Sequence, residues 1–235
     1  MSKSIFIVGT DTDVGKTFVS GGIVYTLKKN EYSSCYFKPI QSGGETNDGK
    51  CTHIDVDFVK KVANISEDKD YMNSYCLKEP LSPHLAFKVD KINFKKNKIM
   101  QDLQNLKNKY EYVIIEGAGG VVVPLIRDNY YIYDLIRDID SSVVIVTKSK
   151  VGTINHTVLT VEFLKNKGIN IKGIIVNDYK GNFYEDDNIE TIKNITGLEI
   201  ISIIRNVKSK DNDFYENIKK EYDRSFDVNK ILKVF

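Results

Sequence analysis

Short apolar runs and longer amphipathic segments alternate along this chain. Six runs rich in isoleucine and valine lie at residues 5–8, 34–37, 112–115, 143–146, 171–176 and 199–204. Apolar and polar positions barely alternate within these runs, which favours strands that are buried on both faces. The sequence therefore predicts a central sheet with few solvent-facing strand positions.

Helical patterns lie between these runs, at residues 16–29, 95–109 and 156–168. Apolar residues recur every three or four positions in these segments, so that one stripe faces a core, and the many lysines of residues 95–109 are expected to form a solvated face. Gly168 favours a helix end. Strands that alternate with helices predict a parallel sheet built from right-handed crossovers, flanked by helices.

The chain is expected to form a single domain over residues 1–235. It contains no internal repeat and no proline-rich linker. Two long stretches, residues 39–52 and 64–93, are predicted to be irregular, and loops of this length often carry function.

Composition narrows the classes of partner. The 34 basic residues nearly balance 32 acidic ones, which gives a net charge of +2 and no strong field for nucleic acid or an anionic membrane. No apolar run reaches the ~20 residues that span a bilayer, and the N-terminus reads as a strand and not as a signal peptide. A cytoplasmic location is expected. The three cysteines share no CxxC spacing and the three histidines lie far apart, so neither a disulfide framework nor a zinc site is expected.

The clearest motif is "GTDTDVGKT" at residues 9–17, between the first apolar run and the first helical pattern. A glycine-rich turn that opens a helix presents backbone N–H groups to an anion. Lys16 adds a charge for terminal phosphates, and the Thr17 hydroxyl can bind Mg²⁺. The loop is one residue longer than the common P-loop, and an ordinary strand-to-helix turn is the alternative. Asp11 and Asp13 would repel phosphates, which points to a cationic group nearby.

Further polar residues are expected near the same edge of the sheet. Glu116 follows an apolar run, where ligands of open α/β sheets bind, and together with Asp55 it could hold Mg²⁺. Asp55 could instead be an acid favoured at a helix N-terminus. Lys38 and Ser42, in "FKPIQSGG", follow another run, and Lys38 could neutralise charge during phosphoryl transfer or simply extend from a strand end into solvent.

Several motifs occur together and in order. They are "GTDTDVGKT", "KPIQSG", Asp55, "EPLSPHLA" (79–86), "EGAGGVVVPL" (116–125), "KVGTINHTVLT" (150–160) and "GIIVND" (173–178). In combination these motifs resemble the dethiobiotin synthetase family of biotin biosynthesis. The resemblance implies a P-loop NTPase-like, three-layer α/β fold and a homodimer with active sites at the subunit interface. It implies a ligase that uses ATP, Mg²⁺, CO₂ and 7,8-diaminononanoate.

The resemblance also assigns roles to residues. It implies catalytic roles for Lys38 and Lys16. The residues that it places around the nucleotide are Asp13, Val14, Gly15, Lys16, Thr17, Phe18, Asp55, Glu116, Gly117, Ala118, Gly119, Asn177 and Asp178. Metal ligands would be Thr17, Asp55 and Glu116. Substrate contacts would be Thr12, Ser42 and Asn155, the last serving the partner subunit, while His156 is expected to be structural.

One departure and two alternatives remain. The family usually has a proline-containing turn near the adenine, but residues 203–211 lack proline, which leaves nucleotide selectivity open. A cobyrinate-type synthetase would use similar chemistry, although a glutaminase domain normally accompanies it. A ParA-like ATPase switch usually has a second lysine early in the loop, which residues 10–14 lack. Beyond residue 205 the chain is expected to be a helical cap or partly mobile.

Overall fold

A parallel seven-stranded sheet forms the centre of the protein. The computed structural model describes residues 2–44, 46–47, 50–207 and 213–235. In these residues the sheet order is β11-β10-β9-β1-β6-β2-β5, and every neighbouring pair is parallel. The strands are β1 (Lys3–Gly9), β2 (Ser34–Gln41), β5 (Asn73–Cys76), β6 (Tyr112–Gly120), β9 (Ser142–Lys148), β10 (Ile171–Tyr179) and β11 (Ile200–Arg205).

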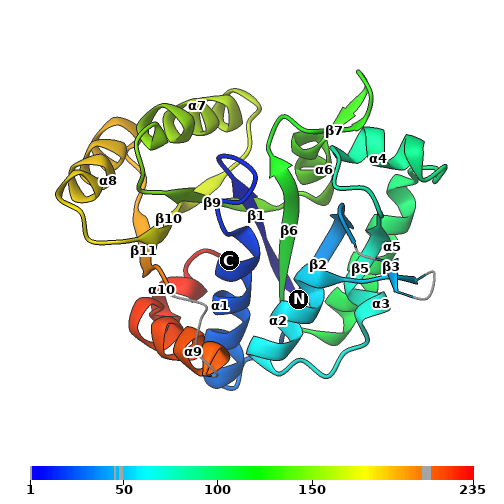
Figure 1. Ribbon diagram of the computed structural model, residues 1–235, viewed down its shortest axis with the longest axis horizontal. Helices are drawn as coiled ribbons and strands as arrows, with labels where there is room; N and C mark the ends of the chain where they lie inside the picture. Colours follow the sequence, from blue (N-terminus) through cyan, green and yellow to red (C-terminus); the bar gives the residue numbers. More distant parts are fainter. Residues whose placement is uncertain (1, 45, 48–49, 208–212) are drawn as a thin grey trace.

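Helices cover both faces of this sheet (Figure 1). They are α1 (Lys16–Lys29), α2 (Ile54–Ala63), α3 (Lys69–Met72), α4 (Pro83–Val89), α5 (Lys96–Lys109), α6 (Ile132–Ile139), α7 (Thr153–Asn166), α8 (Phe183–Thr196), α9 (Phe214–Ser225) and α10 (Val228–Leu232). Figure 1 shows α1, α2 and α9 in front of the sheet, and α5 and α6 behind it. The difference follows from right-handed crossovers, because β1 to β2 and β6 to β9 progress in opposite directions along the sheet.

Two short antiparallel ribbons extend from this sheet. One pairs β3 (Thr46–Asn47) with β4 (Lys50–Cys51), and the other pairs β7 (Pro124–Ile126) with β8 (Tyr130–Tyr131). Both lie in connections that follow the carboxyl ends of strands, the first after β2 and the second after β6 (Figure 1). Among the described residues, no helix has both the length and the apolar character needed to cross a bilayer.

The predicted fold class is confirmed. All six apolar runs are strands, and each strand extends one to five residues beyond the predicted run. The first helical pattern matches α1 at both ends, and the second matches α5 within one residue. The third helix starts three residues before the predicted segment, at Thr153, with the left-handed Gly152 (φ 90°) as its N-cap.

The prediction of long irregular stretches was wrong in part. Strand β2 continues to Gln41, and residues 64–93 contain α3, β5 and α4. Strand β5 lies at the sheet edge, and two of its four residues, Asn73 and Ser74, are polar, so no apolar run marks it. Edge strands are often short and polar, because an exposed apolar edge strand can pair with other chains.

The expectation that no disulfide forms was also wrong. Cys51, on β4, is bonded to Cys76, on β5, with an S–S distance of 2.01 Å, while Cys35 is free and buried. An odd cysteine count does not exclude one bridge, because pairing depends on which strands meet in space. Here the β3–β4 ribbon folds back onto the sheet edge.

The C-terminal segment is helical, which decides between the two alternatives for its described part. Helix α9 packs against α1, where a Cβ on Gly22 would stand 2.3 Å from the Phe226 ring. The Tyr222 hydroxyl donates to the Phe18 carbonyl at 2.6 Å. Only glycine at position 22 permits this close approach. Of the stretch without proline, residues 203–211, the part from 208 onward lies outside the described residues.

Candidate active site

The site opens where three neighbouring strands separate. β2 and β6 last pair at Phe37 and Ile115, and the regular register of β1 with β6 ends at Ile7 and Glu116. Glu116 is therefore inside β6 and not at its end, as the shorter predicted strand had placed it. Lys38 and Glu116 lie just beyond the last β2–β6 pair, so their side chains meet in the gap.

Glu116 is completely buried and accepts three hydrogen bonds. The Thr17 hydroxyl donates to its Oε1 at 2.8 Å, and Lys38 Nζ donates to the same oxygen at 2.5 Å. The Tyr36 hydroxyl donates to Oε2 at 2.8 Å. A buried carboxylate needs such partners, since removing it from water without them costs several kcal/mol.

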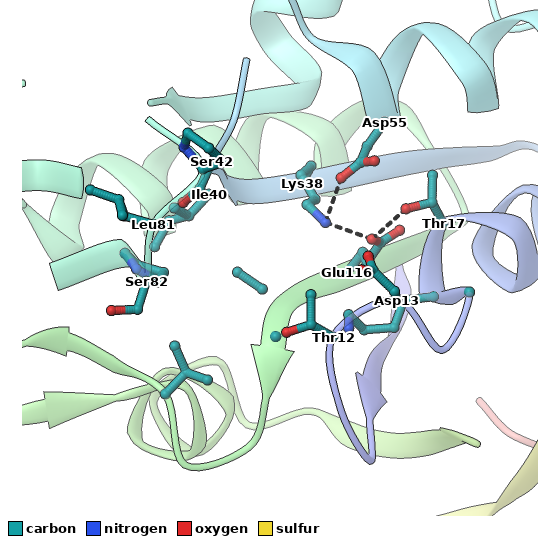
Figure 2. Close-up of a pocket in the computed structure, with 17 residues that line it drawn as sticks. Thr12, Asp13, Thr17, Lys38, Ile40, Ser42, Asp55, Leu81, Ser82 and Glu116 are labelled. Atoms are coloured by element: carbon teal, nitrogen blue, oxygen red, sulfur yellow. Dashed lines mark hydrogen bonds and ion pairs between the residues drawn. The ribbon is translucent and has the colours of Figure 1, made fainter. Parts of the chain in front are cut away.

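Lys38 joins two carboxylates. Its Nζ lies 2.5 Å from Glu116 Oε1 and 2.8 Å from Asp55 Oδ2 (Figure 2). Burial alone would lower the pKa of Lys38, but the charges of Glu116 and then Asp55 outweigh burial and raise that pKa. Burial likewise opposes ionisation of Asp55, and the charge of Lys38 overcomes it and lowers the pKa of Asp55. The three side chains thus form an ion triad in which Lys38 lies between the two carboxylates.

Asp55 lies at a helix N-terminus and also contacts Lys38, while its role as a metal ligand stays a prediction. It lies in the first turn of α2, where the helix dipole favours an acid. Its carboxylate also binds Lys38, and its backbone N–H donates to Gln41 Oε1 at 3.2 Å. The Gln41 amide in turn donates to the Thr52 carbonyl at 3.1 Å. Gln41 therefore holds the start of α2 against the end of β2.

The phosphate loop is supported from behind by β10. Gly15 has φ 94°, and a Cβ there would stand 1.9 Å from Asn177 Nδ2. The Asn177 amide donates to the Val14 carbonyl at 3.0 Å. Glycine is required at position 15 both for its positive φ and for this contact. The loop is therefore held in one shape at the start of α1, where the first N–H groups of a helix can bind an anion.

Lys16 folds back over this loop. Its Nζ donates to the Asp11 carbonyl at 3.0 Å, and only 7% of the residue is exposed. Burial, followed by repulsion from Lys38, lowers the pKa of Lys16 to about 8. A bound anion would restore the charge on this amine, which makes Lys16 responsive to phosphate.

One cavity of about 570 Å³ gathers most of the predicted site. Of the residues proposed from the sequence, it is lined by Thr12, Asp13, Gly15, Lys16, Thr17, Lys38, Ser42, Asp55, Glu116, Ala118 and Gly119. Figure 2 shows two groups among the labelled residues, with Ile40, Leu81, Ser42 and Ser82 apart from the ion triad. The cavity is thus charged near the phosphate loop and has mixed apolar and hydroxyl groups farther away.

Six other predicted residues do not line this cavity. They are Val14, Phe18, Gly117, Asn155, Asn177 and Asp178. The Phe18 ring packs near Phe58 and Tyr222, and the Gly117 carbonyl accepts from Lys38 at 3.3 Å. Asn155 is exposed on α7. Of the six, Val14 and Asn177 contact each other at the loop itself, and the others lie outside the cavity lining.

A second cavity, of about 260 Å³, lies on the opposite side of the phosphate loop. It is lined by Thr10, Asp11, Thr12, Asp13, Val14, Thr147, Lys148, Lys150, Thr153 and His156. Next to it, Asp178 pairs with Lys148 at 3.6 Å and accepts from Asn206 at 2.5 Å. Two lysines thus lie near the two acidic residues that suggested a cationic group beside the loop.

Sequence reasoning missed several residues in or next to the cavity. Leu81 and Ser82 line the cavity from the loop before α4, although "EPLSPHLA" had been noted only as part of a motif. Tyr36 also escaped notice, because an aromatic residue in an apolar run reads as core. Ser42 was proposed, and its Oγ is buried without a hydrogen-bond partner among the described residues. Such an orphaned hydroxyl is suited to a ligand.

The donor atoms fit a hard divalent cation. Thr17, Asp55 and Glu116 present only oxygens, which is the donor set that Mg²⁺ prefers together with phosphate oxygens. The Lys38 ammonium lies between the two carboxylates, so a positive charge is already accommodated there. The three predicted metal ligands therefore lie around one point.

Comparison with known proteins agrees with this geometry. The family described as an AAA domain matches residues 3–213. The ATP-dependent dethiobiotin synthetase BioD of Fusobacterium nucleatum is 47% identical over 204 residues, which cover 87% of this chain and 92% of that protein. The synthetase of the same name from Clostridium novyi is 40% identical and covers 99% of this chain and 98% of that protein.

Solved structures show the same fold at low identity. The septum site-determining protein MinD with Mg-ADP, from Pyrococcus horikoshii, aligns with a TM-score of 0.57 and 16% identity over 100% of this chain and 94% of that one. A ParA family ATPase from Chlorobium tepidum aligns with a TM-score of 0.57 and 14% identity, over 100% and 93%. These structures establish only the P-loop fold. Because the two dethiobiotin synthetases are 40–47% identical to this chain over most of its length, the chain belongs to the family of ATP-dependent dethiobiotin synthetases.

Proposed function

We propose that this protein makes dethiobiotin from 7,8-diaminononanoate, CO₂ and ATP, releasing ADP and phosphate. It is a ligase that closes a ureido ring through two C–N bonds. One amine captures CO₂ as a carbamate, ATP phosphorylates the carbamate, and the second amine displaces phosphate. The observation that carries this proposal is the meeting of Lys16, Lys38 and two carboxylates at one cavity.

The two lysines answer the main electrostatic problem of this reaction. A carbamate and the terminal phosphate of ATP are both anions and repel each other as they approach. Lys16 and Lys38 line the same cavity and can lie between them. In this proposal Lys38 exchanges its contacts with Asp55 and Glu116 for contacts with the reacting oxygens.

A magnesium ion held by Thr17, Asp55 and Glu116 would supply further positive charge to the phosphates. When Lys38 moves away, the negative charges of Asp55 and Glu116 would then still be neutralised, because the metal ion would be their cationic partner. Thr17 is already hydrogen-bonded to Glu116, so its hydroxyl needs little movement to face the cavity. This chain's residues thus fit an exchange of one cation for another.

The nucleotide would lie along the phosphate loop. Residues 13–18 would surround the phosphates with N–H groups at the start of α1, and Gly117, Ala118 and Gly119 would lie beside them. We propose that Asn177 and Asp178 contact the adenine. The Asn177 amide now bonds the Val14 carbonyl, which places it against the same loop.

The diamine would occupy the rest of the cavity. Thr12 and Ser42 would contact the amines or the carbamate, and the Ser42 Oγ has no other described partner. Ile40 and Leu81 line the cavity near Ser42, where they suit the aliphatic part of the substrate (Figure 2).

We further propose a homodimer that completes each site. Asn155 shares the exposed face of α7 with Leu159, four residues later, and Val151 just before the helix is 84% exposed. Apolar residues beside an exposed asparagine are suited to cover by a second subunit. Asn155, near the helix N-terminus, would then bind the carboxylate of the partner's substrate.

A single domain over residues 1–235 and a cytoplasmic location remain part of the proposal. Because the reaction consumes ATP, we place it in the cytoplasm. Reducing thiols there would keep most cysteine pairs open, so we expect the Cys51–Cys76 bridge to be reduced under those conditions.

The assay that tests this function measures phosphate release with components omitted in turn. We expect release only when diamine, bicarbonate and Mg-ATP are all present, with dethiobiotin formed in equal amount by mass spectrometry. Steady ATP hydrolysis that ignores the diamine would instead favour a ParA-like switch. Dependence on a carboxylate and ammonia would favour a cobyrinate-type synthetase.

A further inference from the structure

Tyr36 contacts the site from its sealed side. It lies on β2 two residues before Lys38, so both side chains project from the same face of that strand. Tyr36 is wholly buried and does not line the cavity. Its hydroxyl nevertheless reaches Glu116 Oε2 at 2.8 Å.

The two oxygens of Glu116 are used differently. Oε1 accepts from Thr17 and Lys38, which both line the cavity. Oε2 accepts from Tyr36, beneath the cavity floor. The last torsion of a glutamate is broad and roughly two-fold, so an unheld carboxylate can rotate. Thr17 and Lys38 hold Oε1, and the Tyr36 hydroxyl holds the other oxygen, so the carboxylate stays oriented when Lys38 moves to the reacting oxygens.

We propose that Tyr36 is a positioning residue that fixes Glu116 so that Oε1 is presented to the divalent cation. The inference rests on the proposed metal site of Thr17, Asp55 and Glu116. Partners of ligating carboxylates orient them, and their loss typically weakens metal binding by about 10–100-fold. Tyr36 would act on the metal through Glu116 without touching the metal, substrate or nucleotide.

The test compares three single substitutions. Tyr36→Phe removes only the hydroxyl. Tyr222→Phe is the matched control, because Tyr222 is also fully buried and its hydroxyl donates to a backbone carbonyl, that of Phe18, at 2.6 Å. Glu116→Gln removes the proposed ligand charge itself.

The readout is binding of Mn²⁺, as a probe for Mg²⁺, measured by electron paramagnetic resonance with a non-hydrolysable ATP analogue. We expect Tyr36→Phe to weaken Mn²⁺ binding about tenfold relative to the wild type. In activity assays it should raise the half-saturating Mg²⁺ concentration about as much, while high Mg²⁺ restores kcat and KM for the diamine is unchanged. Tyr222→Phe should bind Mn²⁺ as the wild type does.

The outcomes separate the two proposals. Wild-type Mn²⁺ affinity in Tyr36→Phe, with weak binding in Glu116→Gln, would overturn the role of Tyr36 and leave the metal site standing. Equal weakening in the Tyr36 and Tyr222 variants would also overturn it, as a general effect of losing a buried hydroxyl. Unchanged binding in Glu116→Gln would overturn the metal site itself.

A second variant guards against misfolding. If Tyr36→Phe does not give folded protein, Tyr36→Met also lacks the donor and adapts its shape to the space. The same tenfold loss of Mn²⁺ affinity is expected for it. Wild-type affinity in this variant would overturn the role of Tyr36 equally well.

Discussion

The two halves of the sheet on either side of β1 differ in how their charged and polar side chains are buried and paired. On the β6–β2–β5 side, Lys38 and Glu116 are buried and bonded to each other beside the larger cavity. On the β9–β10–β11 side, Lys148 and Asp178 are partly exposed beside the smaller cavity, and α7 presents Asn155 to solvent. The first half already contains paired charges for chemistry. In the proposed function, the second half binds a nucleotide base, a substrate carboxylate and the second subunit.

This difference shows what each kind of group requires. Buried charges need an oppositely charged partner even without a ligand, since an unpaired buried charge strongly destabilises the folded protein. Recognition groups can remain solvated until their ligand binds. Substitutions in the first half should therefore affect turnover and stability, and those in the second half should mainly affect apparent affinity.

The largest effect is expected at Lys38. Lys38→Gln removes the cation shared by Asp55 and Glu116, so kcat should fall by at least about 10²–10³-fold while nucleotide binding persists. Steady-state product formation and calorimetric titration with ADP measure the two quantities. Full activity in this variant would remove Lys38 from the chemistry.

Opening the Cys51–Cys76 bridge should lower stability at the rim of the same half. The bridge spans 25 residues, so its loss is expected to cost about 3 kcal/mol and roughly 6–12 °C in Tm. Thermal melts with and without dithiothreitol measure the shift. The double variant Cys51→Ser, Cys76→Ser is the control and should not respond to the reductant. Equal Tm values for the wild type in both conditions would contradict the expectation.

Asn155 tests the second half. Asn155→Ala should raise KM for the diamine about 10–100-fold, the size expected for one lost hydrogen bond to a carboxylate. If Asn155 serves the partner subunit, mixing Lys38→Gln with Asn155→Ala subunits should restore about one quarter of wild-type activity, through one intact site in each mixed dimer. No recovery after verified subunit exchange would contradict a site shared between subunits.

The smallest effect is expected at Lys16, where binding of the nucleotide should be coupled to binding of a proton. Its pKa of about 8 leaves the amine mostly neutral at pH 9 in the free protein, whereas bound phosphates favour the charged form. ATP binding should therefore take up close to one proton at pH 9 and none at pH 6.5. Affinity should fall about tenfold from pH 7 to pH 9.

Calorimetry in buffers of different ionisation enthalpy measures this proton uptake. Lys16→Arg provides the control, because arginine keeps its proton throughout this range. Proton uptake that is absent at pH 9, or undiminished in the arginine variant, would show that Lys16 does not titrate on binding.

Much of the site on the β6–β2–β5 side could be predicted from the sequence, because its residues follow strands. Lys38 and Glu116 come after apolar runs that pair side by side, so their meeting follows from a parallel sheet. The P-loop likewise combines a strand, a glycine turn and a helix start. These local signals fix position as well as residue type.

The remaining features depended on tertiary contacts that no local pattern encodes. Tyr36 reads as core until the neighbouring strand brings Glu116 beside it. The disulfide depends on the β3–β4 ribbon folding back to the edge strand β5, which itself has a polar sequence. Asn177 was assigned to adenine, yet its present contact is the Val14 carbonyl, and its role toward the base stays a prediction.

The central claim is that a carbamate and the terminal phosphate of ATP react within one cation-lined cavity. Rapid mixing with ¹⁸O-labelled CO₂ tests it directly, before the label exchanges with water. Phosphorylation of the carbamate predicts that each released phosphate carries one ¹⁸O atom from CO₂ and that the ureido carbonyl keeps the other. Phosphate whose new oxygen comes only from water would mean that ATP is merely hydrolysed, and would contradict this account.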